Sequence, residues 1–254
     1  MMRFEGNIMK SINAPTAFFM GIILLGAASC TMKQAIQLDG AGGGSVAVDI
    51  ELADYLTNVI DQVQALLQPE KPLRDEEAPF FDTEAIRADF AKREGVELIS
   101  LESPSRGSLK GEFRFDDVSR ILQRAETESA SSRMVRFEEH DGISELSVVI
   151  NRETVEALLA ENPSFNNPLV ELFGPAATEG LSESDYLDMM GFALGEESRR
   201  GILDSSLDLT ISVDGRIIGQ KGGYLIDEKT VRYSIPLLPL LMLTEPLEYS
   251  LQYE

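Results

Sequence analysis

The chain has few of the residues on which common catalytic and metal sites depend. Its 254 residues include one cysteine, one histidine and no tryptophan. A single thiol and a single imidazole exclude an internal disulfide, cysteine–histidine catalysis and any metal site that needs two such ligands. The G-x-S-x-G and S-x-x-K patterns of serine acyl transfer and the acidic loop of an EF-hand are also missing. We therefore expect a protein that is not an enzyme and holds no cofactor and no metal.

Positive charge is scarce as well. The 22 lysines and arginines stand against 43 aspartates and glutamates, for a net charge of −21. This excess repels phosphate backbones and anionic lipid headgroups, so nucleic acid is not expected as a partner. Catalysis by a pair of carboxylates stays open, because so many acidic residues place some pair at a suitable separation. The lack of tryptophan, on which sugars commonly stack, weighs against a glycosidase.

The beginning of the chain carries an export pattern. Lys10 precedes an uncharged, mostly apolar run over residues 14–28, and small residues follow before Cys30. A positive segment, an apolar segment and small residues at a cut site define a secretory signal. The run is shorter than the ~20 apolar residues that span a bilayer, which disfavours a transmembrane helix. The sequence therefore predicts a signal peptide over residues 1–29.

The residues before Cys30 resemble the lipobox of bacterial lipoproteins in a relaxed form. The residues that carry this resemblance are Leu25, Gly26, Ala27, Ala28 and Ser29. The resemblance implies that Cys30 becomes the mature N-terminus and carries acyl chains, palmitate among them, that attach it to a membrane. A plain signal peptide cut elsewhere and a free buried cysteine are the alternatives. Removing residues 1–29, with Arg3, Lys10 and Glu5, leaves 20 basic and 42 acidic residues, so lipid rather than protein charge must provide the attachment.

The rest of the chain divides by composition and periodicity into four segments. We predict a lipidated cysteine with a flexible glycine-rich tether over 30–45, an α+β core over 46–160, a helical segment over 161–204, and a β region over 205–254 that forms one compact unit with the core. The tether prediction rests on the glycines of residues 40–44. A phosphate-binding loop is disfavoured, because these glycines precede a strand and have no lysine with them.

Hydrophobic periodicity predicts the elements of the core. Alternation indicates strands over 46–52, 96–101, 109–115, 135–137 and 146–150, and a three-to-four spacing indicates helices over 52–67, 82–95 and 116–125. Asp82, Asp116 and Asn151 are suitable helix caps, and Asp141-Gly142 after His140 is a hairpin signal. The order of these elements predicts an α+β fold whose antiparallel sheet has a ferredoxin-like β-α-β-β-α-β core.

The C-terminal region adds β-hairpins to this core. Alternation recurs over residues 207–213, 231–235 and 247–253, after a helix that Ser182 is placed to cap. The layout from Leu207 to Ser234, with its TVRYSI run, is similar to small α+β envelope lipoproteins of unassigned biochemistry. That resemblance implies an acylated cysteine and a short tether, and it supplies no active-site residues.

An apolar stretch near the C-terminus allows two interpretations. If buried it is core, and if exposed it is a surface for a partner or ligand; its members are Leu237, Leu238, Leu240, Leu241, Met242 and Leu243. We expect a non-catalytic, lipid-anchored cell-envelope protein that faces the periplasm or exterior and binds or scaffolds another envelope protein. The alternative is a carrier with an apolar pocket for a lipid or other small molecule.

Overall fold

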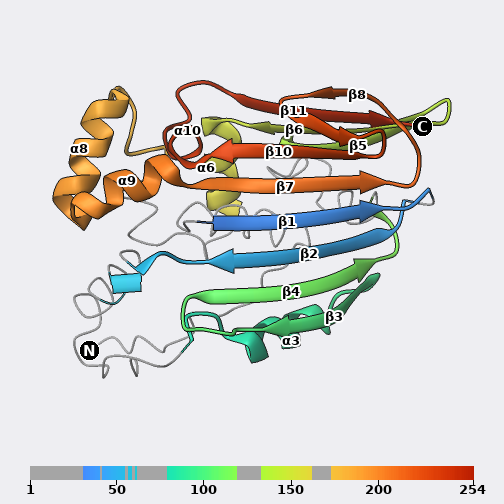
Figure 1. Cartoon of the computed structure of the whole chain (residues 1–254), viewed down its shortest axis with the longest axis horizontal. Coiled ribbons are helices and arrows are strands. Elements are labelled where there is room, and N and C mark those ends of the chain that lie inside the picture. Colours follow the sequence, from blue (N-terminus) through green and yellow to red (C-terminus); the bar gives the residue numbers. More distant parts are fainter. Residues whose placement is uncertain are drawn as a thin grey trace.

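Two sheets organise the part of the chain that the computed structural model describes, namely residues 31–40, 42–54, 57, 58, 61, 79–118, 133–161 and 173–254. The larger sheet has seven strands in the order β3 (Val96–Glu102), β4 (Ser108–Phe115), β2 (Gly44–Glu51), β1 (Thr31–Leu38), β7 (Ser206–Val213), β10 (Thr230–Pro236) and β9 (Tyr224–Asp227). The smaller sheet has the order β5 (Val135–His140), β6 (Ile143–Ile150), β11 (Leu247–Tyr253) and β8 (Ile217–Lys221). With the helices this is the expected α+β class (Figure 1).

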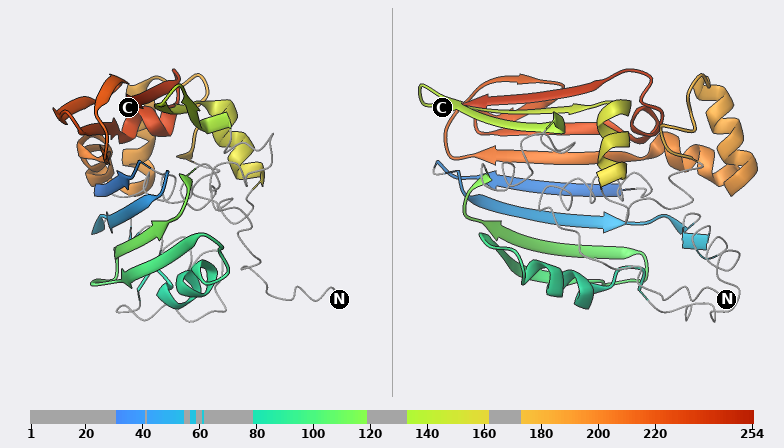
Figure 2. Two further views of the ribbon diagram at one scale, coloured as in Figure 1. Left: turned by 90° about the vertical axis from the view of Figure 1, so that its right-hand side faces the viewer. Right: turned by 180° about the vertical axis from the view of Figure 1, so that it is seen from behind.

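The helices lie at the ends and on one side of these sheets. They are α3 (Thr83–Phe90), α6 (Arg152–Glu161), α8 (Glu183–Leu194), α9 (Glu196–Asp204) and α10 (Leu237–Met242). Helices α8 and α9 project from the end of the large sheet at which β1 and β7 begin, and both the front and the rear view show this (Figures 1 and 2). No helix in the described ranges is both long and apolar enough to cross a bilayer.

Strand β1 corrects the predicted tether. Residues 31–38 pair along their whole length with β2 and with β7, antiparallel to β2 and parallel to β7. Met32, Gln34 and Leu38 are buried while Lys33 and Gln37 are exposed, which is the alternation of a strand with one covered face. The tether predicted over 30–45 is therefore wrong for 31–38, because these residues form the middle strand of the large sheet.

The glycines that suggested a tether instead allow a tight turn between β1 and β2. The backbone N–H of Gly43 donates to the Asp39 carboxylate at 2.9 Å, and the Asp39 N–H donates to the Gly43 carbonyl at 2.9 Å. A Cβ atom at Gly44 would lie 2.0 Å from the carbonyl oxygen of Gln37. Glycine is required there because the two strands approach too closely for a side chain.

The α+β class is confirmed, but the predicted ferredoxin-like arrangement is not: three of its four strands are neighbours in the large sheet and the fourth is not. Strand β4 lies between β2 and β3 and is antiparallel to both, with α3 in the connection from β2 to β3, as in a split β-α-β unit. The fourth strand, β5, pairs instead with β6 in the small sheet. Strand β1 occupies the place beside β2 that the fourth strand of a ferredoxin-like core would take. Its short turn to β2 makes that pairing the more local one.

Several of the predicted caps and turns are confirmed. The carboxylate of Asp82 accepts from the Ala85 N–H at 2.9 Å, and Ser182 caps α8. Asp141 and Gly142 have φ values of 53° and 78°, as a two-residue hairpin of type I′ requires. Most of the helix predicted over 52–67 and nearly all of the one predicted over 116–125 lie outside the described residues.

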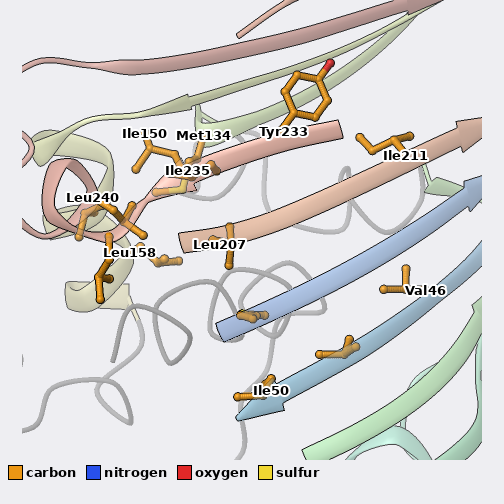
Figure 3. Close-up of a cluster of buried hydrophobic side chains, with 14 of the residues drawn as sticks. Val46, Ile50, Met134, Ile150, Leu158, Leu207, Ile211, Tyr233, Ile235 and Leu240 are labelled. Carbon is orange, nitrogen blue, oxygen red and sulfur yellow. The ribbon is translucent and has the colours of Figure 1, made fainter. Parts of the chain in front are cut away.

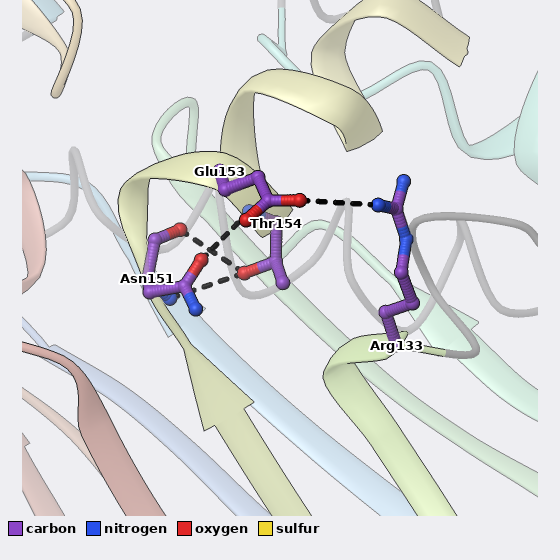
Figure 4. Close-up of polar contacts among 4 residues, drawn as sticks. All are labelled: Arg133, Asn151, Glu153 and Thr154. Carbon is purple, nitrogen blue, oxygen red and sulfur yellow. Dashed lines mark hydrogen bonds and ion pairs between the residues drawn. The ribbon is translucent and has the colours of Figure 1, made fainter.

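Helix α6 begins with a reciprocal cap (Figure 4). The side-chain oxygen of Asn151 accepts from the Thr154 N–H at 2.8 Å, and the Thr154 hydroxyl contacts the backbone N–H of Asn151 at 3.0 Å. An ion pair between Arg133 and Glu153, at 3.3 Å, lies beside it. The cap predicted at Asn151 is thus confirmed, and it satisfies backbone groups that the first turn of a helix leaves unpaired.

One hydrophobic core lies between the sheets and the helices. Its buried side chains come from both sheets and from α6 and α10, and include Val46, Ile150, Leu158, Leu207 and Leu240 (Figure 3). At the junction of the sheets, Tyr233 on β10 donates a hydrogen bond from its hydroxyl to the Ser250 carbonyl of β11 at 2.7 Å. The apolar halves of the alternating strands therefore meet in a shared interior, as the periodicity requires.

Candidate functional surfaces

The proposed acylation site lies immediately before the first described residue. Cys30 and the lipobox residues Leu25 to Ser29 are outside the described residues. Thr31, the next residue, pairs with Glu51 on β2 and with Ser206 on β7. A single peptide bond therefore separates Cys30 from the middle strand of the large sheet, so any group on its sulfur is attached next to the folded domain.

The apolar stretch near the C-terminus is core, and its interpretation as an exposed surface is wrong. The exposed fractions of Leu237, Leu238, Leu240, Met242 and Leu243 lie between 1 % and 6 %. The sixth member, Leu241, is partly buried and packs on the same core. These side chains form α10 and its end, so they offer no docking surface. The carrier alternative, which invoked the same residues, stays a prediction.

Polar contacts hold the end of α10 against two other segments. The carbonyl oxygen of Met242 accepts from the Arg152 guanidinium at 3.1 Å and from the Thr178 hydroxyl at 3.3 Å. Arg152 opens α6, and Thr178 lies in the turn before α8. Leu243 follows with a φ of 45°, in the left-handed region that ends many helices. The packing of α10 is therefore fixed on several sides.

A different apolar surface is exposed, and the sequence analysis did not identify it. Tyr224, Leu225 and Ile226 of β9 are 53 %, 51 % and 54 % exposed, and Ile218 of β8 is 43 % exposed. Strand β9 is the last strand of the large sheet and β8 is the last strand of the small one. We call these four residues the β9 edge surface. In the sequence, these three consecutive residues of β9 stand between a glycine pair and a charged turn. They interrupt the apolar–polar alternation of the neighbouring strands, and this interruption is the sequence feature that could have identified them.

The glycine pair determines where this surface lies. Gly222 and Gly223 carry the chain from β8 in the small sheet to β9 in the large one. A Cβ atom would lie 2.6 Å from the Tyr249 ring at Gly222 and 2.7 Å from the Tyr233 ring at Gly223. Gly222 also has a φ of 83°. The crossing thus packs directly on the rings of Tyr233 and Tyr249. Only glycine, which has no side chain, leaves room for these rings at both positions.

An ionic ladder crosses the strands beside β9. Asp208 on β7 accepts from Arg232 at 2.6 Å and from the Ser234 hydroxyl at 2.7 Å, both on β10. Burial acts to raise the pKa of Asp208, but the hydrogen bonds from Ser234 and Arg232 and the charge of Arg232 outweigh it, so its pKa lies below the usual value. Arg232 in turn faces Tyr224 on β9 in the strand register. The ladder therefore links β7 to β10 and ends beside β9.

His140 lies at the hairpin between β5 and β6, and its Nδ1 atom contacts the Glu139 carbonyl oxygen. Among the residues that the structure describes, no group of three or more histidine, cysteine, aspartate or glutamate side chains is placed to hold a metal ion.

Comparison with known proteins assigns no family. No family model matches the chain, and no curated protein matches it. Among solved structures, the folded domain of LppM from Mycobacterium tuberculosis, determined by NMR, is similar over 88 % of each chain, with 12 % sequence identity and a TM-score of 0.41. A TM-score of this size does not support a shared fold or function, so the function is argued from the residues of this chain.

Proposed function

We propose that the chain is a lipid-anchored, non-catalytic protein of the cell envelope whose folded domain binds another envelope protein through the β9 edge surface. The acylated Cys30 holds it on a membrane, and the domain faces the periplasm or the exterior. Two independent features support this proposal, one for the anchor and one for the binding surface.

The anchor is supported by the beginning of the chain. Lys10, the apolar run and the small residues before Cys30 follow the order of a secretory signal that ends at an acylated cysteine. The domain itself has a large negative charge, which does not favour binding to anionic membranes. Two or more acyl chains provide stable attachment without any contribution from protein charge.

The exposed apolar residues of β9 are the observation that carries the binding function. An edge strand presents unpaired backbone N–H and C=O groups, and proteins usually protect such edges with charged residues or proline. Here Tyr224, Leu225 and Ile226 occupy the edge instead, each more than half exposed. An extended segment of a partner can add to such an edge by backbone hydrogen bonds, while apolar contacts with these side chains give specificity.

The charge of the chain indicates what kind of partner fits this edge. A second copy of the domain carries the same net charge, −21 for the full chain, and would be repelled. Lys221, Asp227, Glu228 and Lys229 flank the apolar residues with both signs of charge. A different protein, with an extended apolar segment, is therefore the partner we propose.

The anchor is tested by intact mass spectrometry of the protein extracted from membranes. We expect a chain that starts at Cys30 and carries the mass of a diacylglyceryl group, and a Cys30→Ala variant that no longer sediments with membranes. An unmodified cysteine, or a Cys30→Ala variant that still sediments with them, would refute the anchor.

The binding surface is tested by photo-crosslinking in cells. A photoreactive residue at position 225 is compared with the same residue at position 143, because Ile143 is also exposed but lies at the tip of the β5–β6 hairpin. We expect a discrete crosslinked protein from position 225 only, lost when Tyr224 and Ile226 are both replaced by lysine. Equal crosslinking from both positions, or none from 225, would contradict the proposal.

A further inference from the structure

We infer that the α8–α9 corner, by which we mean these two helices with the exposed Phe192 on α8 and Leu203 near the end of α9, lies against the same lipid bilayer that holds Cys30. This inference rests on the proposed acylation of Cys30 and adds a second membrane contact, made by protein side chains. The two contacts together set the orientation of the domain on the membrane.

The strand register places this corner beside the anchor. Helix α9 ends at Asp204, Ser205 follows, and Ser206 begins β7 opposite Thr31. Thr31, the first described residue, therefore lies next to the end of α9. Figures 1 and 2 show α8 and α9 projecting beyond the sheet at this same end. Because Cys30 is bonded to Thr31, we place the bilayer that holds its acyl chains at the end of the domain where these helices project.

Two large apolar side chains are exposed at the corner. Phe192 is 96 % exposed and Leu203 is 56 % exposed. Elsewhere on α8, Tyr186 and Met190 are buried, at 0 % and 5 % exposed, and the remaining large apolar side chains are partly buried. The residues around Phe192 in the sequence are small or apolar, Gly191 and Ala193. Phenylalanine and leucine are the residue types that enter the boundary between headgroups and acyl chains when a helix lies on a membrane.

The charges of the corner indicate that the contact is apolar rather than electrostatic. Arg199 pairs with Asp188 at 2.6 Å and lies 3.9 Å from Glu196, so its charge is compensated within the corner. Along α9, Glu197 and Asp204 add two further negative charges and Arg200 adds one positive charge, so the balance stays negative. An anionic surface would be repelled, whereas an uncharged, zwitterionic one would not. We therefore expect the contact to be stronger on phosphatidylcholine than on phosphatidylglycerol. Salt should leave it unchanged on phosphatidylcholine and should weaken the repulsion on phosphatidylglycerol.

The absence of tryptophan from the chain permits a direct test. A Phe192→Trp variant carries a single tryptophan in the position of the exposed phenylalanine, and Ile143→Trp is the matched control. Ile143 begins β6, at the hairpin with β5, and this hairpin lies at the opposite end of the domain from the start of β1 (Figure 1). Both acylated proteins are reconstituted into phosphatidylcholine vesicles, with and without brominated acyl chains, and flotation of the vesicles verifies attachment.

We expect bromine to quench the fluorescence of Phe192→Trp by about twofold or more, because interfacial residues lie within reach of the upper acyl chains, and to leave Ile143→Trp unchanged. If the protein floats with vesicles but Phe192→Trp is not quenched, the anchor stands and the corner contact is refuted. If the protein does not float and Cys30 is unmodified, the anchor is refuted and the corner contact with it. An unquenched Phe192→Trp that crosslinks to an envelope protein would also refute it, by assigning the corner to a protein contact.

Discussion

The hydroxyl of Tyr233 donates a hydrogen bond to the backbone carbonyl of Ser250 at 2.7 Å, and this bond joins the two sheets of the domain. The Tyr233 ring also packs edge-on against Tyr249, with 5.6 Å between ring centroids. Because Tyr233 is only 2 % exposed, water cannot readily replace the bond. The chain crosses from β8 to β9 over this same pair, so the position of the β9 edge surface depends on it.

Loss of this bond is expected to destabilise the domain. Tyr233→Phe keeps the ring and leaves the Ser250 carbonyl without its donor, which should lower the free energy of unfolding by about 1–2 kcal/mol. Urea denaturation followed by circular dichroism measures the change. Tyr249→Phe is the control, because it keeps the ring pair and the Tyr233 hydroxyl, and a similar loss in both variants would contradict the prediction.

The same tyrosine makes the domain sensitive to alkaline pH. Burial raises the pKa of Tyr233 from 10.0 to about 12, so the folded state holds its proton more tightly than the unfolded state does. Its contribution to stability is complete below pH 10 and is lost as the pH rises from 10 through about 12. Unfolding midpoints measured at several pH values should fall steeply over that interval, and less steeply in Tyr233→Phe. Parallel profiles for the two proteins would show that Tyr233 is not responsible.

Replacing a glycine in the crossing from β8 to β9 is expected to destabilise the domain more than replacing a glycine in an open turn. Gly222→Ala puts a Cβ atom 2.6 Å from the Tyr249 ring at a φ of 83°. Gly142→Ala imposes a similar φ of 78°, but no heavy atom lies within 4 Å of the new Cβ. Backbone strain alone should cost about 1–2 kcal/mol in each, and the collision should add at least about 1 kcal/mol in Gly222→Ala. Denaturant titrations measure the loss of unfolding free energy in each variant. Equal losses would contradict the prediction, because they would mean that the Tyr249 ring moves aside at no energetic cost.

The ionic ladder makes the stability of the domain depend on acidic pH. Stability should fall as the pH is lowered, whereas the Tyr233 contribution is lost as the pH is raised. The pKa of Asp208 is below its usual value, so its carboxylate stabilises the domain above about pH 4 and this contribution is lost as the pH falls further. Asp208→Asn should cost about 1 kcal/mol at neutral pH, since Arg232 is partly exposed, and should flatten the acid limb of the stability profile. Chemical denaturation at pH 7 and pH 3 compares the two proteins. A variant that keeps the full slope of the wild type would exclude Asp208 as the titrating group.

Local patterns predicted individual elements well. The alternation over Val46 to Glu51 corresponds to β2, and Asp141-Gly142 forms the hairpin turn that its residue types favour. Asp82, Asn151 and Ser182 cap the helices that follow them. These features depend on residues within a few positions of one another, so the sequence contains the information directly.

Pairing between distant segments was predicted less well. Strand β1 was missed, although Met32 and Leu38 alternate with polar residues, because the neighbouring glycines suggested a tether. A ferredoxin-like core would place β5 beside β2, but β5 pairs with β6 instead. Which strand lies beside which depends on the competition between all possible partners, and that competition is not visible in the period of any one segment.

The sequence by itself determined the acidity of the chain, its single thiol, its single imidazole and the alternation of most of its strands, because composition and local spacing need no partner to be defined. Only the tertiary structure decided that residues 31–38 lie in the middle of a sheet, that Leu237 to Leu243 are covered, and that Tyr224 to Ile226 are not. Burial is a property of what packs against a side chain. Two apolar segments of the same chain can therefore end as core and as surface according to their place in the strand order.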